Sequence, residues 1–165
     1  MERNDKFLTR DRMRYTRNST SSTLAYVAIL FNVFYYVYIY NFDVGNYYYN
    51  AITGASVVCN LLFLLFAFLA SEGVKNYNNK FALVLIALGA FQIVRIFYIP
   101  LNALNATIVI GGETVQVMTV GQFALSAAFL TLSSIAAIAG GIIGFIKTGM
   151  LRSHEKSLAK ASENN

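Results

Sequence analysis

Four long apolar runs, separated by short polar segments, dominate the pattern of this sequence. They cover residues 22–42, 51–70, 81–100 and 123–146. A helix rises about 1.5 Å per residue, so about twenty apolar residues cross the hydrocarbon core of a bilayer, which is about 30 Å thick. The pattern therefore predicts an all-α integral membrane protein, with residues 22–146 forming a four-transmembrane-helix bundle.

The segment between the third and fourth runs has a different pattern. Two short stretches rich in β-branched residues flank Gly111-Gly112, a dipeptide suited to a two-residue hairpin turn. We expect a β-hairpin over residues 106–118, with one face carrying Ile108, Ile110, Val115 and Val117. A two-stranded hairpin is marginal alone. Its apolar face is therefore expected to rest on the bundle, the lipid headgroups or another subunit.

The composition agrees with lipid as the solvent. The 165 residues are 56% hydrophobic and only 13% charged, whereas soluble domains average about 25% charged residues. A soluble protein would have to bury four fully apolar helices inside one small domain, which would leave little polar surface. We therefore set the soluble alternative aside.

Lysine and arginine are distributed asymmetrically. Six lie in residues 1–21, two in residues 71–80 and four in residues 147–165, whereas residues 43–50 and 101–122 contain none. Cytoplasmic loops are enriched in these residues. The pattern predicts a plasma membrane protein with a basic cytoplasmic segment at 1–21, a polar cytoplasmic tail at 147–165 and an extracytoplasmic hairpin. The net charge of +5 is then a topological signal, and nucleic-acid binding is not needed to explain it. The first run lacks a small-residue cleavage site, which favours a retained anchor.

Each run carries polar side chains near its centre. By helix rise, Asn32 and Gln92 lie roughly 15 and 17 Å from the inner ends of their runs, and Asn60 lies roughly 14 Å from the outer end of its run. All three are close to the bilayer midplane, and Ser133 and Ser134 lie at a similar depth. Such groups are costly against lipid, so they are expected to face inward and to bond one another. They serve either as interhelical contacts or as the lining of a polar constriction or substrate site. The layer contains no carboxylate or histidine, which favours the structural role.

Arg95 is the only charged residue within the four runs. It lies one turn beyond Gln92, roughly 8 Å from the outer end of its run. We expect its side chain to snorkel to the interface, or to pair with Asp43 or Glu113. The functional alternative is contact with an anion or with an acidic residue of a neighbouring subunit.

Two further patterns suggest packing. The second half of the first run and the following connection are rich in tyrosine, typical of an interfacial belt, with an aromatic ligand cage as the alternative. The fourth run carries small residues at helical spacing, which predicts a close helix neighbour in the bundle or in a partner. They are Ala136, Gly140 and Gly144, with Ser133, Ala137 and Gly141 beside them.

Catalytic chemistry has little support in this sequence. The chain has one cysteine, Cys59, and one histidine, His154, too few for a paired redox site or a histidine-ligated metal. No aspartate or glutamate lies within the runs. We therefore expect a non-enzymatic protein without cofactor or metal. Its partners are the bilayer and either a larger membrane assembly, which it serves as an accessory subunit, or copies of itself, which enclose a channel or transport path.

Overall fold

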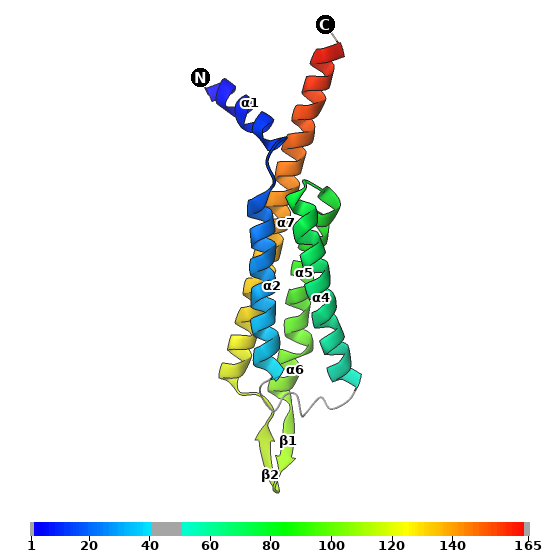
Figure 1. Cartoon of the computed structure of the whole chain (residues 1–165). Coiled ribbons are helices and arrows are strands. Elements are labelled where there is room, and N and C mark those ends of the chain that lie inside the picture. The colour runs from blue at the N-terminus through cyan, green and yellow to red at the C-terminus, as the bar shows by residue number, and fades with distance from the viewer. Residues whose placement is uncertain (1, 41–50, 164–165) are drawn as a thin grey trace.

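The computed structural model describes residues 2–40 and 51–163, and its main body is a bundle of four helices (Figure 1). All four are long and apolar enough to cross a membrane. The prediction of a mostly helical chain with four such helices and one small hairpin is confirmed. The helices are α2 (Ser19–Tyr40), α4 (Ala51–Lys75), α5 (Asn79–Tyr98) and α7 (Val120–Glu163).

The first turn of α2 is capped by a residue that precedes the helix. Asn18 is the capping residue, because its Oδ1 accepts a hydrogen bond from the backbone N–H of Ser21 at 3.4 Å. The serine hydroxyls bind neighbouring helices instead. Ser21 donates to the carbonyl oxygen of Gly140, and Ser22 pairs with Ser71 of α4 at 2.8 Å.

Two helices extend past the ends of their apolar runs. Helix α4 continues to Lys75 instead of ending near residue 70, and α7 continues to Glu163 instead of ending near residue 146. The predicted polar tail is therefore mostly helix. The apolar pattern reports only the expected membrane thickness, whereas the tail is rich in strong helix formers such as alanine, leucine, lysine and glutamate.

The basic N-terminal segment also contains a helix, α1 (Glu2–Met13), which lies near the extended part of α7 (Figure 1). The ring of Phe7 packs edge-on against His154 with their centroids 4.9 Å apart. His154 is buried, and its Nε2 lies 3.5 Å from a carboxylate oxygen of Asp11. This contact connects the two ends of the chain outside the bundle.

Pro100 separates α5 from the short helix α6 (Pro100–Asn105). Proline suits the first turn of a helix, where its missing N–H would be unpaired in any case. Ile99 and Ala103 are buried at this end of the bundle in a cluster with Ile39 of α2 and Leu130 of α7. The start of the hairpin is thus fixed against the bundle.

The hairpin pairs β1 (Thr107–Ile110) with β2 (Glu113–Gln116). Ile108 lies opposite Val115, and Val109 lies opposite Thr114, as the turn predicts. Gly111 and Gly112 have φ angles of 64° and 93°, the left-handed conformation that this turn type requires.

The hairpin projects beyond the bundle at the end opposite the two termini (Figure 1). Ile108 packs against the apolar cluster, and Val117 and Met118 are buried in it. Val115, however, is 44% exposed, and Val109 is 72% exposed. The expected contact with the bundle is therefore made only at the base of the hairpin.

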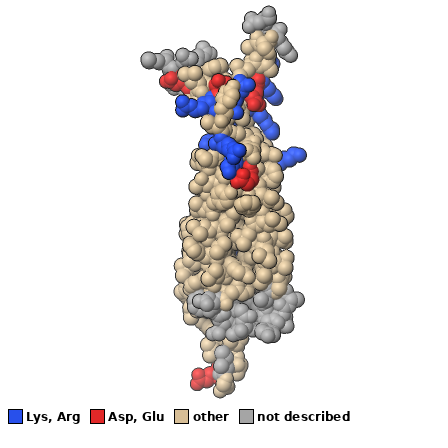
Figure 2. Space-filling model, viewed as in Figure 1, with Lys and Arg blue, Asp and Glu red and all other residues tan. Residues whose placement is uncertain are grey.

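Charged side chains collect at the end of the bundle that carries the termini (Figure 2). On the face shown, the part of the bundle between this end and the hairpin is almost free of charge. The described basic residues other than Arg95 come from α1, from the link between α1 and α2, from the ends of α4 and α5, and from the second half of α7. Glu113 lies at the hairpin end. The molecule is therefore electrostatically polar along its long axis.

Candidate functional site: a buried arginine–amide cluster

The four bundle helices each direct one or more polar side chains to a common point. Helix α2 contributes Asn32, α4 contributes Asn60, α5 contributes Gln92 and Arg95, and α7 contributes Ser133. We refer to these five residues as the Arg95 cluster. All five side chains are buried, with Arg95 only 4% exposed.

Arg95 lies at the centre of the hydrogen bonds. Its Nη1 donates to Asn32 Oδ1 at 2.9 Å and to Gln92 Oε1 at 2.8 Å. Its Nη2 donates to Asn60 Oδ1. The planar guanidinium therefore joins amide oxygens from three helices, which a single ammonium group would do less well because it lacks this fixed fork of donors.

Gln92 extends the network to the fourth helix. Its Nε2 donates to Asn32 Oδ1 at 2.9 Å and to Ser133 Oγ at 3.0 Å. Ser133 in turn donates to the carbonyl oxygen of Ala28 at 2.8 Å. Asn32 Oδ1 therefore accepts two bonds, one of them from a charged donor, and it is the shared acceptor of the cluster.

Ser134 does not join the side-chain network. Its hydroxyl donates to the carbonyl oxygen of Gly89 at 2.8 Å, and so it connects α7 to α5 through the backbone. The structure thus brings Asn32, Asn60, Gln92 and Ser133 together around Arg95, with Ser134 beside them. Their depth in a bilayer stays a prediction.

Aromatic rings cover the guanidinium. Its central carbon lies 4.9 Å from the ring centroid of Tyr35 and 6.0 Å from that of Phe91, within the range of cation–π attraction. Tyr35 is fully buried, so this tyrosine is not part of an interfacial belt. Tyr40, one turn and a half further along α2, donates a hydrogen bond to Ser56 of α4 at 2.8 Å.

The snorkelling expected for Arg95 is wrong, because its side chain turns into the bundle. Glu113, one of its two expected partners, is exposed on β2. The other, Asp43, lies outside the described residues. In the described part of the chain no carboxylate forms a salt bridge with Arg95, so the charge is met by neutral acceptors and aromatic faces.

The cluster has more donors than acceptors. Arg95 Nε and Asn32 Nδ2 are buried without a hydrogen-bond partner among the described residues. A buried, unpaired donor costs about 1–3 kcal/mol. The cluster therefore carries one positive charge and two donor nitrogens without a partner among the described residues, a combination that favours an additional acceptor or an anion.

The small residues of α7 are used within the bundle. A Cβ added at Gly140 would lie 3.1 Å from the carbonyl oxygen of Ser21 on α2, and one added at Gly141 would lie 2.7 Å from that of Ala82 on α5. At Gly144 it would lie 2.9 Å from Ser21 Oγ. Ala136 packs against Ala28 of α2. This stripe positions α2 and α5 against α7 and is not available to a partner helix.

Sequence reasoning did not identify several residues that shape the site. The ring of Tyr35 lies against the Arg95 guanidinium and Tyr40 bonds Ser56 of α4, although the residue types alone did not indicate these contacts. The helical spacing did contain one usable signal. Gln92 and Arg95 are three residues apart and share one face, so an inward Gln92 implies an inward Arg95.

Comparisons of the chain with models of protein families, with curated proteins and with solved structures find no match. Among the residues that the structure describes, no group of three or more histidine, cysteine, aspartate or glutamate side chains could hold a metal ion. The function of the chain is therefore inferred from the chemistry of the Arg95 cluster and of the surfaces around it.

Proposed function

We propose that this chain is a small, non-enzymatic integral membrane protein that acts as an accessory or structural subunit of a larger membrane transporter or assembly. The supporting observation is that the Arg95 cluster is enclosed within one copy of the chain. Its amides bond one another and the guanidinium, and so they hold four helices in register. A side-chain layer used in this way stabilises a scaffold and is not presented to a neighbouring copy.

The proposed orientation places both termini in the cytoplasm and the hairpin outside the plasma membrane. The support is the collection of lysine and arginine at the terminal end of the bundle (Figure 2). In this orientation the extended part of α7 projects into the cytoplasm, and the hairpin projects from the opposite face.

The hairpin is the proposed partner contact on the outer side. Val109 and Val115 are exposed beyond the bundle on opposite faces of the hairpin, so either face offers an apolar side chain to another protein. The small-residue stripe of α7 no longer supports a partner contact, because α2 and α5 occupy it.

A homo-oligomeric channel or transporter is the alternative function. One observation favours it: Arg95 is a buried cation that forms no salt bridge with a carboxylate of the described residues. Charged groups within membrane spans often mark ion or substrate pathways. In this alternative the Arg95 cluster would act as an anion-selective constriction.

The test is purification of the tagged full chain in mild detergent, comparing the wild type with Val109→Ser/Val115→Ser. We expect a larger membrane protein in fixed stoichiometry with the wild type and its loss from the variant. The control is Thr107→Ser/Thr114→Ser, which alters the same two strands but keeps a hydroxyl side chain at both positions. This control should retain the partner. A pure homo-oligomer that carries anion flux in liposomes, abolished by Arg95→Gln, would replace the proposal with the channel alternative.

A further inference from the structure

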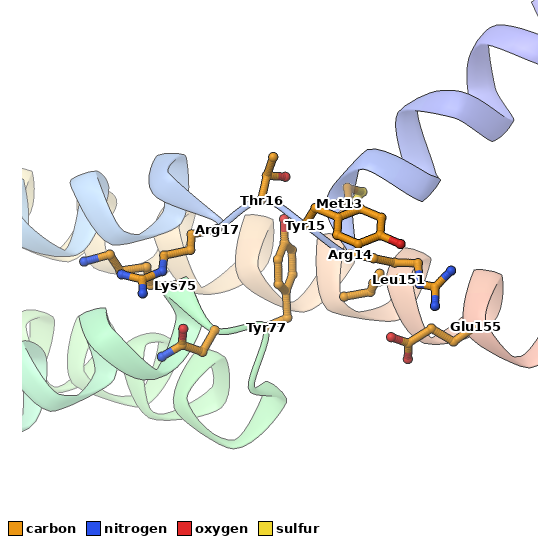
Figure 3. Close-up of a pocket in the computed structure, with 10 residues that line it drawn as sticks. Met13, Arg14, Tyr15, Thr16, Arg17, Lys75, Tyr77, Leu151 and Glu155 are labelled. Carbon is orange, nitrogen blue, oxygen red and sulfur yellow. The ribbon is translucent and has the colours of Figure 1, made fainter.

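A pocket lies at the terminal end of the bundle, where three parts of the chain meet. It is formed by the link between α1 and α2, the turn between α4 and α5, and the extended part of α7 (Figure 3). Its volume is about 310 Å³, at the lower end of the range for small-ligand sites. Three cations, Arg14, Arg17 and Lys75, line it together with two tyrosines, Tyr15 and Tyr77.

The level of this pocket along the bundle is defined by the candidate spans. Arg17 precedes the span that begins at Ser19 by two residues, and Lys75 is the last residue of the span that begins at Gly54. Side chains at these positions lie at the depth of the lipid headgroups if the spans cross a bilayer. Tyrosine is enriched at that depth because its ring tolerates acyl chains and its hydroxyl prefers water.

The charges around the pocket are partly balanced. Arg14 lies 3.4 Å from Asp11, and Lys75 lies 3.1 Å from Glu72. Glu155 adds a carboxylate to the lining. Arg17 is exposed and forms no salt bridge with a residue that the structure describes. It lies two residues before α2, and the N-terminal end of that helix adds positive potential.

The pocket also has an apolar side. Met13 and the buried side chain of Leu151 contribute to its lining. The turn that carries Tyr77 is held by hydrogen bonds from the backbone N–H groups of Tyr77 and Asn78 to the carbonyl oxygens of Val74 and Gly73, both at 3.1 Å. An apolar wall beside cations fits a ligand in which a phosphate adjoins hydrocarbon.

We propose that this pocket binds the phosphate of an anionic phospholipid headgroup from the leaflet facing the termini. Arg17 is the principal phosphate contact, Arg14 and Lys75 supply further positive charge, and the tyrosine rings line the headgroup. The site is independent of any protein partner, because all its lining residues belong to one copy.

The test uses the purified full chain in zwitterionic detergent with equal amounts of phosphatidylglycerol and phosphatidylcholine, with bound lipid counted by native mass spectrometry. We expect the wild type to retain phosphatidylglycerol preferentially. Removing two cations in Arg14→Gln/Arg17→Gln should reduce the preference by about 10–30-fold, since a basic residue near an anionic surface contributes about a factor of five.

The matched control is Lys80→Gln/Arg152→Gln, which removes the same charge from exposed residues at the same end that do not line the pocket. A diffuse basic surface would make both double variants lose the same preference, and this result would overturn the proposal. A third variant, Tyr15→Ala, changes the lining of the pocket without removing a charge. Tyr15 is 80% exposed and its ring lies 5.8 Å from the Arg14 guanidinium, so we expect a loss of about 2–5-fold with the fold intact.

Competition distinguishes a phospholipid headgroup from free inorganic phosphate as the ligand of the pocket. An excess of inorganic phosphate should leave the bound phosphatidylglycerol in place, because it lacks the hydrocarbon that contacts Met13 and Leu151. Displacement of the lipid by inorganic phosphate would identify a free phosphate site instead and would overturn the lipid assignment. Helical circular dichroism and gel filtration of each variant establish that differences in binding do not come from unfolding.

Discussion

Arg95 Nη1 on α5 lies 2.9 Å from Asn32 Oδ1 on α2, although 63 residues separate them in the chain. The same oxygen accepts a bond from Gln92 Nε2 at 2.9 Å. One amide oxygen thus satisfies two buried donors, one of them charged. The register of α2 against α5 depends on this acceptor.

Replacing Asn32 with leucine should therefore destabilise the bundle. The substitution keeps the approximate volume and removes an acceptor from a buried guanidinium, which costs about 2–3 kcal/mol. The measurement is reversible unfolding in mixed micelles with increasing denaturing detergent. Asn102→Leu is the control, because Asn102 is exposed and bonds only the carbonyl oxygen of Tyr98 within the described residues. A change of less than about 0.5 kcal/mol for Asn32→Leu, as expected for a surface site, would contradict the role of this acceptor.

Arg95→Lys separates the shape of the guanidinium from its charge. The ammonium keeps the charge but cannot present a planar fork to Asn32, Gln92 and Asn60 together. We expect a loss of about 1–3 kcal/mol in the same unfolding assay, corresponding to one charged hydrogen bond. Unchanged stability would mean that Arg95 acts as a generic cation.

The sequence alone was sufficient for the number and approximate positions of the four helices, because the length of an apolar run reports the thickness to be crossed. It also predicted the hairpin, because Gly111-Gly112 dictates the turn. The ends of α4 and α7 were not predictable from hydropathy, which changes at the membrane boundary whether or not the helix stops.

The direction of Arg95 differs from the prediction because depth along a helix does not determine a side chain's rotation about the helix axis. Near the outer end of a span, a long side chain can reach water, and snorkelling then follows from depth alone. In this structure the Arg95 side chain points into the bundle because Gln92 and Arg95 lie on the buried face of α5. Leu85 and Gly89 lie on the same face. Which helices would meet at Arg95 depended on tertiary packing that no local pattern contains.

Two glycines on α7 should respond to alanine with opposite signs. At Gly141 an added Cβ would lie 2.6 Å from Ile86 Cγ1 and 2.7 Å from the carbonyl oxygen of Ala82, so Gly141→Ala should destabilise by about 1–3 kcal/mol through overpacking. At Gly149 nothing lies within 4 Å. Gly149→Ala should therefore stabilise the helix by up to about 1 kcal/mol.

Thermal unfolding of the purified variants followed by circular dichroism gives the order of stability for this pair. The expected order is Gly149→Ala, wild type, Gly141→Ala. Equal melting temperatures for the two variants would mean that α5 and α7 do not approach as closely as the structure has them.

The proposed orientation predicts opposite labelling of the two ends of the molecule. With Cys59 replaced by alanine, single cysteines are introduced by Thr114→Cys on β2 and Ser153→Cys on α7, both at exposed positions. A membrane-impermeant maleimide added to intact cells should label the hairpin cysteine only. The α7 cysteine should react only after the membrane is permeabilised, because the basic end is retained in the cytoplasm. Labelling of both cysteines from the same side would contradict a single membrane crossing between residues 114 and 153. The proposed four-span topology would then be wrong.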